Sequence, residues 1–528
     1  MLGRLLGRVG PQRLVSLAFN LRPNSEYIVF GRQRITRREA WRRIKAMATG
    51  LHALGVRKGD RVATLLPSCP EAILAAFLPG YLGTVSVPLN PLLCEDELRY
   101  ALSDCGARAV LTTRSWYGHD HAAMLRGLRS DLPDLRHVVV RKQGAGGEQG
   151  FLFPQESAGP GRARRPVRMS GEDPVSISYT SGTTGQAKGV VHSQGAYWGL
   201  AVEAASRRLD LSPLRCLLLP FPPYHYAGLL GIVSTLLAGG RIVTFERFDP
   251  TRMLESVESE LVTQIAASPT MYRWLLDTPG QERYDLSSVR RLTFSTEPCS
   301  RELAQELHAR MGCNLENMYG TTESRLASWT GLNDSWERAA TTVGRAVPGV
   351  RIRIVDDERR ELPSGGQGEI AVQTSQMMTG YHRDPALTAQ YLDAEGWFYT
   401  GDVGYLGEDG YLRLVDRKKD LIIRGGENVS PIEVESCLLR HPAVRGAGVI
   451  GVPSRTSGEA IWAYVEPQPG AEITATEVLS FCRGRIAPFK IPEIVRFVRR
   501  LPVTSTGKVR KFVLREMAAE EQAAAHGD

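Results

Sequence analysis

The stretch that decides the fold lies at residues 179–190, Tyr179-Thr180-Ser181-Gly182-Thr183-Thr184-Gly185-Gln186-Ala187-Lys188-Gly189-Val190. An apolar segment leads into a loop in which glycines and hydroxyl side chains alternate, and a lysine closes the loop. Glycines let backbone N–H groups approach an anion, hydroxyls donate to phosphate oxygens, and lysine adds a positive charge. The spacing is not that of a Walker A loop, because Lys188 is followed by glycine rather than by Ser or Thr. The stretch therefore predicts a strand that ends in a phosphate-binding loop, in preference to a flexible linker.

Strands and helices alternate on both sides of this loop. Ser68 is predicted as the N-cap of a helix at 71–78, with Pro70 in its first turn. This β-α-β pattern predicts a large N-terminal domain of mostly parallel sheets covered by helices. Strands are predicted at 61–66, 84–89, 175–179, 217–219, 242–245 and 291–294.

The pattern changes after Tyr399 to short strands and tight turns. Gly407–Gly410 is a hairpin signal that predicts an added β-subdomain. A polar run, Arg417–Asp420, is followed by a compact β/α pattern, which predicts a small α+β domain hinged at that run. The expected domains are 1–416 and 417–528. The second domain should contain strands at 421–424, 446–452 and 461–465, and helices at 431–440 and 475–486, the first opened by a capping box, Ser430-Pro431-Ile432-Glu433.

Composition excludes several classes of protein. The chain has 528 residues, enough for about three to four structural units. Its hydrophobic fraction of 42% and charged fraction of 23% are ordinary for globular proteins and exclude disorder, collagen and coiled coil. A net charge of +8 is mild and does not imply a nucleic acid partner.

Cysteine usage and hydropathy give the expected location. No two of the eight cysteines have zinc-knuckle spacing, and they are too few for a disulfide scaffold. Prolines break the longest uncharged stretch, 216–240, so that its helical part of about 13 residues is too short to span a bilayer. Four arginines in the first 25 residues imitate a transit peptide, but a domain-like pattern begins by about residue 14. We expect a cytoplasmic protein without an integral membrane segment.

Five stretches, in this order along the chain, resemble the motifs of the adenylate-forming superfamily: acyl-CoA synthetases, non-ribosomal-peptide adenylation domains and beetle luciferases. They are the loop at 180–188, then Tyr319-Gly320-Thr321-Thr322-Glu323, Tyr399-Thr400-Gly401-Asp402, Asp416–Asp420 with Gly425–Pro431, and Pro502–Lys508. The resemblance covers residues 14 to 515 and is strongest to acyl-CoA synthetases. It implies an enzyme that joins a carboxylic acid to ATP as an acyl adenylate, releases pyrophosphate, and transfers the acyl group to a thiol.

The resemblance also implies where ATP and Mg²⁺ bind. Thr322 would contact the α-phosphate, Glu323 would bind Mg²⁺, and Asp402 would accept from the ribose hydroxyls with the help of Arg417. The nucleotide site would further include Tyr319, Gly320 and Thr321, and the loop residues Thr180, Ser181, Gly182, Thr183, Thr184, Gly185 and Lys188, which would hold the β- and γ-phosphates.

Lys508 would bridge the substrate carboxylate and the α-phosphate, which makes Lys508, Thr184 and Glu323 the implied catalytic residues. Lys419 fits the hinge on which the family swings its small domain between the two half-reactions. Gly425 and Gly426 would line the pantetheine tunnel after that swing.

The acid would be bound by His225, Tyr226, Thr296 and Glu297. Amino-acid-activating relatives carry an aspartate near His225, and this sequence has none. An unpaired ammonium in an apolar pocket is costly, so an α-amino acid is not expected, and an aliphatic or aromatic acid is. Thr296 stands where glycine is common in the family, which would narrow the pocket, and Ala187 replaces the usual proline before Lys188.

The leading prediction is an AMP-forming acid–CoA ligase that uses ATP, Mg²⁺ and coenzyme A. The alternatives are an enzyme that loads an acyl carrier protein, and a degenerate scaffold that binds nucleotide without turnover. A homodimer is left open. His119-Asp120-His121 lacks a third ligand at metal spacing, and no Gly-x-Ser-x-Gly elbow is present for a serine hydrolase.

Overall fold

The computed structural model describes residues 11–142, 150–151, 166–180, 187–199, 215–297, 299–418, 420–424, 427–454, 458–483, 485–504 and 507–526. The apolar segment before the glycine-rich loop is a strand, β8 (Pro174–Thr180), inside a sheet with the order β19-β9-β8-β4-β3-β5-β6-β7. The strands β8, β4, β3, β5 and β6 run parallel, and the other three pair antiparallel at the edges. Their bounds are β3 Arg61–Leu65, β4 Val85–Leu89, β5 Ala109–Thr112, β6 His137–Lys142, β7 Gly150–Phe151, β9 Lys188–Ser193 and β19 Gly380–Tyr381.

A second large sheet has the order β16-β15-β14-β13-β12-β10-β11-β1-β2 within the described chain. Its central strands are again parallel, and its outermost strands at both ends are antiparallel. The bounds are β1 Glu26–Phe30, β2 Gln33–Thr36, β10 Cys216–Leu218, β11 Arg241–Thr244, β12 Gln264–Ala267, β13 Arg291–Phe294, β14 Asn314–Thr321, β15 Arg325–Trp329 and β16 Arg345–Ala346.

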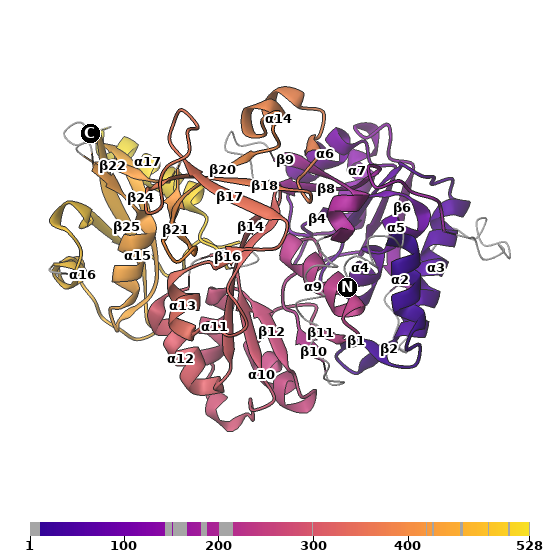
Figure 1. The fold of residues 1–528 in the computed structure, drawn as a ribbon, viewed down its shortest axis with the longest axis horizontal. Helices are drawn as coiled ribbons and strands as arrows, with labels where there is room; N and C mark the ends of the chain where they lie inside the picture. Colours follow the sequence, from indigo (N-terminus) through magenta and orange to yellow (C-terminus); the bar gives the residue numbers. More distant parts are fainter. Residues whose placement is uncertain are drawn as a thin grey trace.

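Two smaller sheets follow along the chain. The antiparallel sheet β17-β18-β20-β21 is the β-subdomain, and a C-terminal sheet has the order β23-β22-β25-β24, with β26 parallel to β25. Figure 1 shows the C-terminal sheet, in orange to yellow, on the side of the molecule opposite the N-terminal helices. The bounds are β17 Val350–Val355, β18 Gly368–Thr374, β20 Phe398–Leu406, β21 Leu412–Arg417, β22 Ile422–Arg424, β23 Glu427–Val429, β24 Val444–Ser454, β25 Gly458–Pro467 and β26 Ile494–Phe497.

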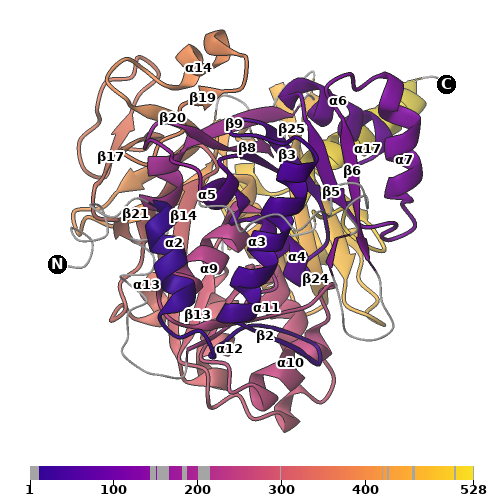
Figure 2. The ribbon, with the colours of Figure 1, turned by 90° about the vertical axis from the view of Figure 1, so that its right-hand side faces the viewer.

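Helices cover the faces of these sheets, and Figure 2 shows α2, α3 and α5 side by side over the N-terminal part. None of the described helices combines the length and apolar character that a membrane crossing requires. The α-helices are α2 Pro11–Asn20, α3 Arg37–Ala53, α4 Pro70–Ala75, α5 Leu78–Leu82, α6 Glu95–Cys105, α7 His121–Gly127, α9 Tyr226–Leu237, α10 Pro250–Ser259, α11 Pro269–Leu276, α12 Arg301–Met311, α13 Trp336–Thr341, α14 Pro385–Tyr391, α15 Pro431–Leu439, α16 Ala475–Cys482 and α17 Lys511–His526, with 3₁₀ turns at Leu128–Ser130, Gln281–Arg283 and Pro488–Lys490.

The two large sheets share one apolar core. Ile28 and Leu217 from the nine-stranded sheet and Val62 from the eight-stranded sheet belong to the same buried cluster as Ile44 of α3 and Ile232 of α9. Burying an aliphatic side chain of this size contributes about 1.5–3 kcal/mol. Because one core joins both sheets, the strand ends that carry the functional residues are held at fixed positions relative to one another.

The C-terminal unit is docked on the rest of the chain by bonds that cross the polar run. The Asp416 carboxylate, near the end of β21, accepts from the Ser430 hydroxyl (2.9 Å) and from the Ile432 N–H (3.1 Å) at the start of α15. Further along, the Gly507 carbonyl accepts from the Thr270 hydroxyl of α11 (3.5 Å). A Cβ on Gly507 would lie 2.8 Å from the Thr270 Cβ, and Gly507 has a φ of +90°, so this close approach requires glycine.

The predicted α/β fold, with a β-subdomain and a small C-terminal unit, is confirmed, and some local predictions were wrong. The helices predicted at 71–78 and 475–486 end earlier, at Ala75 and Cys482. Cys69, not Ser68, precedes α4, because Pro70 occupies the first helical position. The capping box at α15 is only half formed: Ser430 accepts from the Glu433 N–H, but the Glu433 carboxylate binds Lys490 instead of the backbone. The predicted domain boundary after residue 416 falls at the last residue of β21.

Candidate active site

One large cavity, about 2250 Å³, lies between the two large sheets, the β-subdomain and the C-terminal unit. Every described residue of the predicted site lines it: Thr180, Lys188, His225, Tyr226, Thr296, Glu297, Tyr319, Gly320, Thr321, Thr322, Glu323, Asp402, Arg417 and Lys508. The predicted loop residues Ser181, Gly182, Thr183, Thr184 and Gly185, together with Lys419, Gly425 and Gly426, lie outside the described residues.

Asp402 is held between a tyrosine and an arginine. It stands opposite Arg417 in the β20–β21 register, and the Arg417 Nε lies 3.0 Å from its Oδ1. The Tyr319 hydroxyl donates to Oδ2 (2.8 Å). The charge of Asp402 raises the pKa of Arg417, and burial together with Asp402 raises that of Tyr319. Asp402 is therefore a hydrogen-bond acceptor held in one orientation, which suits a pair of hydroxyl donors.

Glu323 follows the strand that carries Tyr319. The Tyr381 hydroxyl donates to its Oε1 (3.0 Å), and its backbone carbonyl accepts from the Met378 N–H (2.8 Å). Lys188, at the start of β9, places its ammonium 4.7 Å from the centre of the Tyr391 ring and 5.5 Å from that of Tyr381. Tyr381 thus contacts both the Glu323 carboxylate and the Lys188 ammonium, which places the two groups at the same wall of the cavity.

His225 caps α9 and faces the cavity. Its Nδ1 accepts from the Ala227 N–H (3.2 Å), and its ring stacks on Phe221 at 5.9 Å. Burial, together with the nearby charge of Lys508, lowers its pKa to about 4, so the ring is neutral at neutral pH. His225 therefore has a structural role as a helix cap in addition to lining the cavity.

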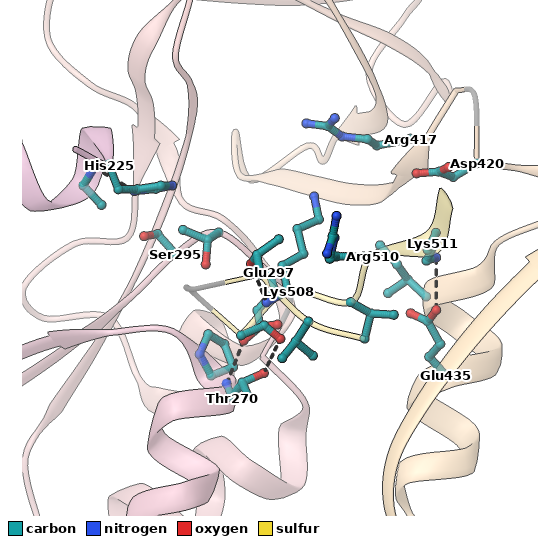
Figure 3. A pocket seen from close by; sticks show the side chains of 18 of the residues that line it. His225, Thr270, Ser295, Glu297, Arg417, Asp420, Glu435, Lys508, Arg510 and Lys511 are labelled. Atoms are coloured by element: carbon teal, nitrogen blue, oxygen red, sulfur yellow. Dashed lines mark hydrogen bonds and ion pairs between the residues drawn. The ribbon is translucent and has the colours of Figure 1, made fainter. Parts of the chain in front are cut away.

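Ser295, Thr296 and Glu297 line the cavity after β13. Thr296 has a φ of +79°, a conformation that is strained for a β-branched residue, and its buried hydroxyl has no hydrogen-bond partner among the described residues. The Glu297 carboxylate accepts from the Thr270 N–H at the start of α11 (2.7 Å), and burial raises its pKa. Figure 3 shows Glu297 turned toward Thr270, next to Lys508.

Lys508 enters the cavity from the C-terminal unit. Its backbone is fixed by two bonds to Thr504, one from the Thr504 N–H to the Lys508 carbonyl (2.8 Å) and one from the Lys508 N–H to the Thr504 hydroxyl (3.1 Å). The side chain is exposed to the cavity, yet the surrounding protein and the charge of Arg417 lower its pKa to about 8. Its ammonium is thus a cation at neutral pH, between the His225 side and the Arg417 side of the cavity (Figure 3).

Sequence reasoning missed several residues of this region. Tyr381, which holds Glu323, and Thr270, which holds Glu297 and Gly507, lie far in sequence from the motifs they support. No pattern in the chain marks them, because their roles arise only from packing. Ser295 and Arg510 also line the cavity, and for Arg510 the signal was its position two residues after Lys508.

Arg325 was also missed, although it lies two residues after the motif that ends at Glu323. It is 2% exposed and has a φ of +64°, and its guanidinium lies 4.8 Å from the Tyr226 ring and 5.5 Å from the Tyr197 ring. Burial lowers its pKa, and no carboxylate among the described residues pairs with it. The arginine connects the strand after Glu323 to the wall formed by Tyr226.

Comparison with known proteins agrees with this arrangement. The family model "AMP-binding enzyme" matches residues 17–382, and "AMP-binding enzyme C-terminal domain" matches residues 433–508. A feruloyl-CoA synthase of Amycolatopsis sp. is 35% identical over 93% of this chain and 96% of its own length. The medium-chain fatty-acid–CoA ligase of Escherichia coli is 34% identical over 89% of this chain and 83% of its own length.

Solved structures give the same result. ATP-bound MatB from Rhodopseudomonas palustris aligns with a TM-score of 0.85 and 29% identity, covering 96% of this chain and 98% of that one. The anthranilate CoA ligase AuaEII, in complex with anthranoyl-AMP, aligns with a TM-score of 0.87 and 26% identity over 97% of both chains. The matches to the two family models and to these relatives show that this chain belongs to the AMP-binding enzyme family.

Proposed function

We propose that the protein is an ATP-dependent acid–CoA ligase, in which the cavity residues have the roles predicted from their motifs. The observation that carries this proposal is the position of Lys508, which reaches from the C-terminal unit into the cavity lined by Asp402, Glu323 and His225. A cation between the side proposed for the acid and the side proposed for the nucleotide is what acyl-adenylate formation needs.

The first half-reaction joins two anions. A carboxylate oxygen attacks the α-phosphorus of ATP, the bond from that phosphorus to the bridging oxygen breaks, and pyrophosphate leaves. The carboxylate is already ionised, so no general base is required, and the barrier is dominated by repulsion and by charge on the transferring phosphoryl group. Lys508 would donate to both the carboxylate and an α-phosphate oxygen, and Asp402 would hold the ribose hydroxyls. Catalysis then consists of positioning and charge neutralisation.

The residues present fit a magnesium ion supplied with ATP. Mg²⁺ is usually bound by one or two carboxylates together with substrate phosphates. Glu323 offers one carboxylate at the cavity wall, and Tyr381 orients it through Oε1. The ion would neutralise phosphate charge when ATP is bound, and the neighbouring hydroxyls of Thr321 and Thr322 line the same wall.

The second half-reaction transfers the acyl group to the thiol of coenzyme A, with AMP as the leaving group. Residues 417–528 would act as a lid that rotates at Lys419 and brings Gly425 and Gly426 to the pantetheine tunnel. Relatives named as CoA ligases or synthases support CoA as the acceptor. A phosphopantetheine arm on a carrier protein presents the same thiol and stays the alternative acceptor.

The acid is proposed to be aliphatic or aromatic. Apolar side chains line the cavity beyond His225, among them Ala227, Leu230, Leu326 and Val343. The names of the relatives include a feruloyl-CoA synthase, a medium-chain fatty-acid–CoA ligase and an anthranilate CoA ligase. Thr296, in its strained conformation, would limit the width of the acid that fits.

The proposal is tested by pyrophosphate release with a panel of aliphatic, aromatic and α-amino acids, each with ATP and Mg²⁺. We expect release with at least one aliphatic or aromatic acid, and an acyl-CoA product by mass spectrometry when CoA is added. Acyl transfer to a carrier protein but not to CoA would favour the alternative acceptor. If no acid in the panel supported release of pyrophosphate, the proposed function would be wrong.

Adenylation should fail in alkaline solution because it needs Lys508 as a cation. The pKa of Lys508 is lowered to about 8, so the protonated form dominates below that pH and is lost as the pH rises through it. We expect kcat/KM for adenylation to be level between about pH 6.5 and 7.5 and to fall about tenfold per pH unit above pH 8. Lys508→Arg, measured where it retains activity, should lose this alkaline limb. If kcat/KM of the variant still fell above the same pH, the fall would have to come from another titrating group.

A further inference from the structure

Arg510 is one of several basic residues of the C-terminal unit that line the cavity, and it lies two residues after Lys508. The chain from Lys508 to Arg510 is extended: Val509 forms a bridge with Val503, and the Arg510 N–H donates to the Pro502 carbonyl (2.8 Å). In extended backbone, residues two apart point to the same side. Lys508 and Arg510 therefore share one direction, while a Cβ on Gly448 would lie 3.0 Å from the Val509 side chain, which packs on β24. Figure 3 shows the Arg510 guanidinium beside the Lys508 side chain.

The step from Lys508 to Arg510 leads toward the nucleotide half of the cavity. His225 and Ser295 lie on one side of Lys508, and Arg417 and Asp420 lie on the other (Figure 3). Arg510 stands on the Asp420 side, about 7 Å further along the chain at roughly 3.3 Å per residue. In the proposed function, a group on that side would face the ribose and phosphates of the nucleotide rather than the acid.

Among the described residues, no carboxylate forms an ion pair with the Arg510 guanidinium. The next two basic residues are paired, Lys511 with Glu435 (3.0 Å) and Arg515 with Asp420 (2.7 Å). Arg510 has no carboxylate partner among the described residues, and it rests 4.7 Å from the centre of the exposed Phe512 ring. An arginine with fixed backbone and unpaired donors in a cavity can bind phosphate oxygens through two parallel hydrogen bonds.

We propose that Arg510 is a further catalytic residue, which contacts the β- or γ-phosphate of ATP and stabilises the pyrophosphate leaving group. The inference rests on the proposed function. When the bond from the α-phosphorus to the bridging oxygen breaks, the electron pair passes to pyrophosphate, and the Arg510 N–H groups donate to the oxygens where that charge grows. Lys508 would then stabilise charge at the α-phosphate, and Arg510 would stabilise charge on the leaving pyrophosphate.

The test compares Arg510→Gln, Arg510→Lys and a matched control, Arg483→Gln, in an exposed arginine of the same unit that does not line the cavity. Acid-dependent exchange of labelled pyrophosphate into ATP measures the first half-reaction, and transfer from preformed acyl-AMP to CoA measures the second. We expect Arg510→Gln to lower kcat/KM for ATP in the exchange at least tenfold, Arg510→Lys to recover part of that loss, and both to transfer from acyl-AMP within twofold of the parent. Arg483→Gln should match the parent in both assays.

The outcomes separate the inference from the function on which it rests. If the parent enzyme exchanges pyrophosphate and Arg510→Gln retains kcat/KM within twofold, or if transfer from acyl-AMP falls as much as exchange, Arg510 does not bind the leaving group. A parent enzyme with no exchange for any acid would instead overturn the proposed function. Thermal melting of each variant shows whether it is folded, and an Arg510→Gln protein that fails to fold leaves Arg510→Lys as the deciding variant: a kcat/KM equal to that of the parent would then reject the inference.

Discussion

Lys508→Ala should lower acyl-adenylate formation by about a hundredfold or more while leaving thiolation largely intact. The reason is geometric: Lys508 lines the cavity between the side proposed for the acid and the side proposed for the nucleotide, and losing one preorganised donor at a reacting group costs about 2.7–4 kcal/mol. Rapid-quench measurement of acyl-AMP from acid and ATP gives the first rate, and transfer from preformed acyl-AMP to CoA gives the second. The second rate should change by less than about fivefold, because the proposed lid rotation removes Lys508 before the thiol attacks.

A matched control is available in the same unit. Lys490 binds Glu433 through its ammonium (2.7 Å) and does not line the cavity, so Lys490→Ala removes a lysine of the lid without touching the site. It should retain the parental rate in both half-reactions. Equal losses of adenylation and thiolation in Lys508→Ala would contradict the alternation of the lid between two positions.

Asp402→Ala should weaken the binding of ATP and AMP together, by about thirtyfold to a hundredfold each. Its carboxylate is the acceptor proposed for both ribose hydroxyls, and hydrogen bonds to a charged group contribute about 1.5–3 kcal/mol. The substitution also leaves Tyr319 and Arg417 without their partner, which would loosen the wall that faces the nucleotide. Titration calorimetry with each nucleotide provides the two dissociation constants.

Asp409→Ala serves as the control for this change. Asp409 lies in the turn between the same two strands and pairs with Arg338 and Arg413, but it does not line the cavity. Its loss should leave both dissociation constants within twofold of the parent. If Asp402→Ala weakened the binding of ATP but not of AMP, the carboxylate would have to act at the phosphates rather than at the ribose.

Much of the fold could be predicted from the sequence where a proline or an apolar run restricts the local conformation. The strand predicted at 291–294 matches β13, and the helix predicted from Pro431 matches α15 to within one residue, because prolines and apolar runs restrict these segments locally. The cap of α4 was missed because Ser68 and Cys69 both precede Pro70, and only the backbone shows which residue is the cap.

The candidate site was predictable where a residue belongs to a motif and not where its role depends on packing. Lys508, Asp402 and Glu323 stand in recognisable stretches, and the described cavity brings them together. Tyr381 orients Glu323 from 58 positions along the chain, a relation that only the tertiary structure reveals. Arg325 would pass in sequence for a surface residue, since most arginines are exposed, yet it is buried between two tyrosines.

The hydrogen bonds from Ser430 and Ile432 to Asp416 affect the population of the docked position of the proposed lid. Hydrogen bonds to a carboxylate, such as these two, contribute about 1.5–3 kcal/mol each when it is charged, and every 1.4 kcal/mol is a factor of ten in the ratio of two states. If rotation at residue 419 breaks both bonds, the docked position is favoured by about a hundredfold or more until other contacts compensate. The undocked position is then a minor state in the free enzyme, and the energy that populates it has to come from what the rotated lid binds. Arrival of the thiol substrate would thus set the waiting time between the two chemical steps.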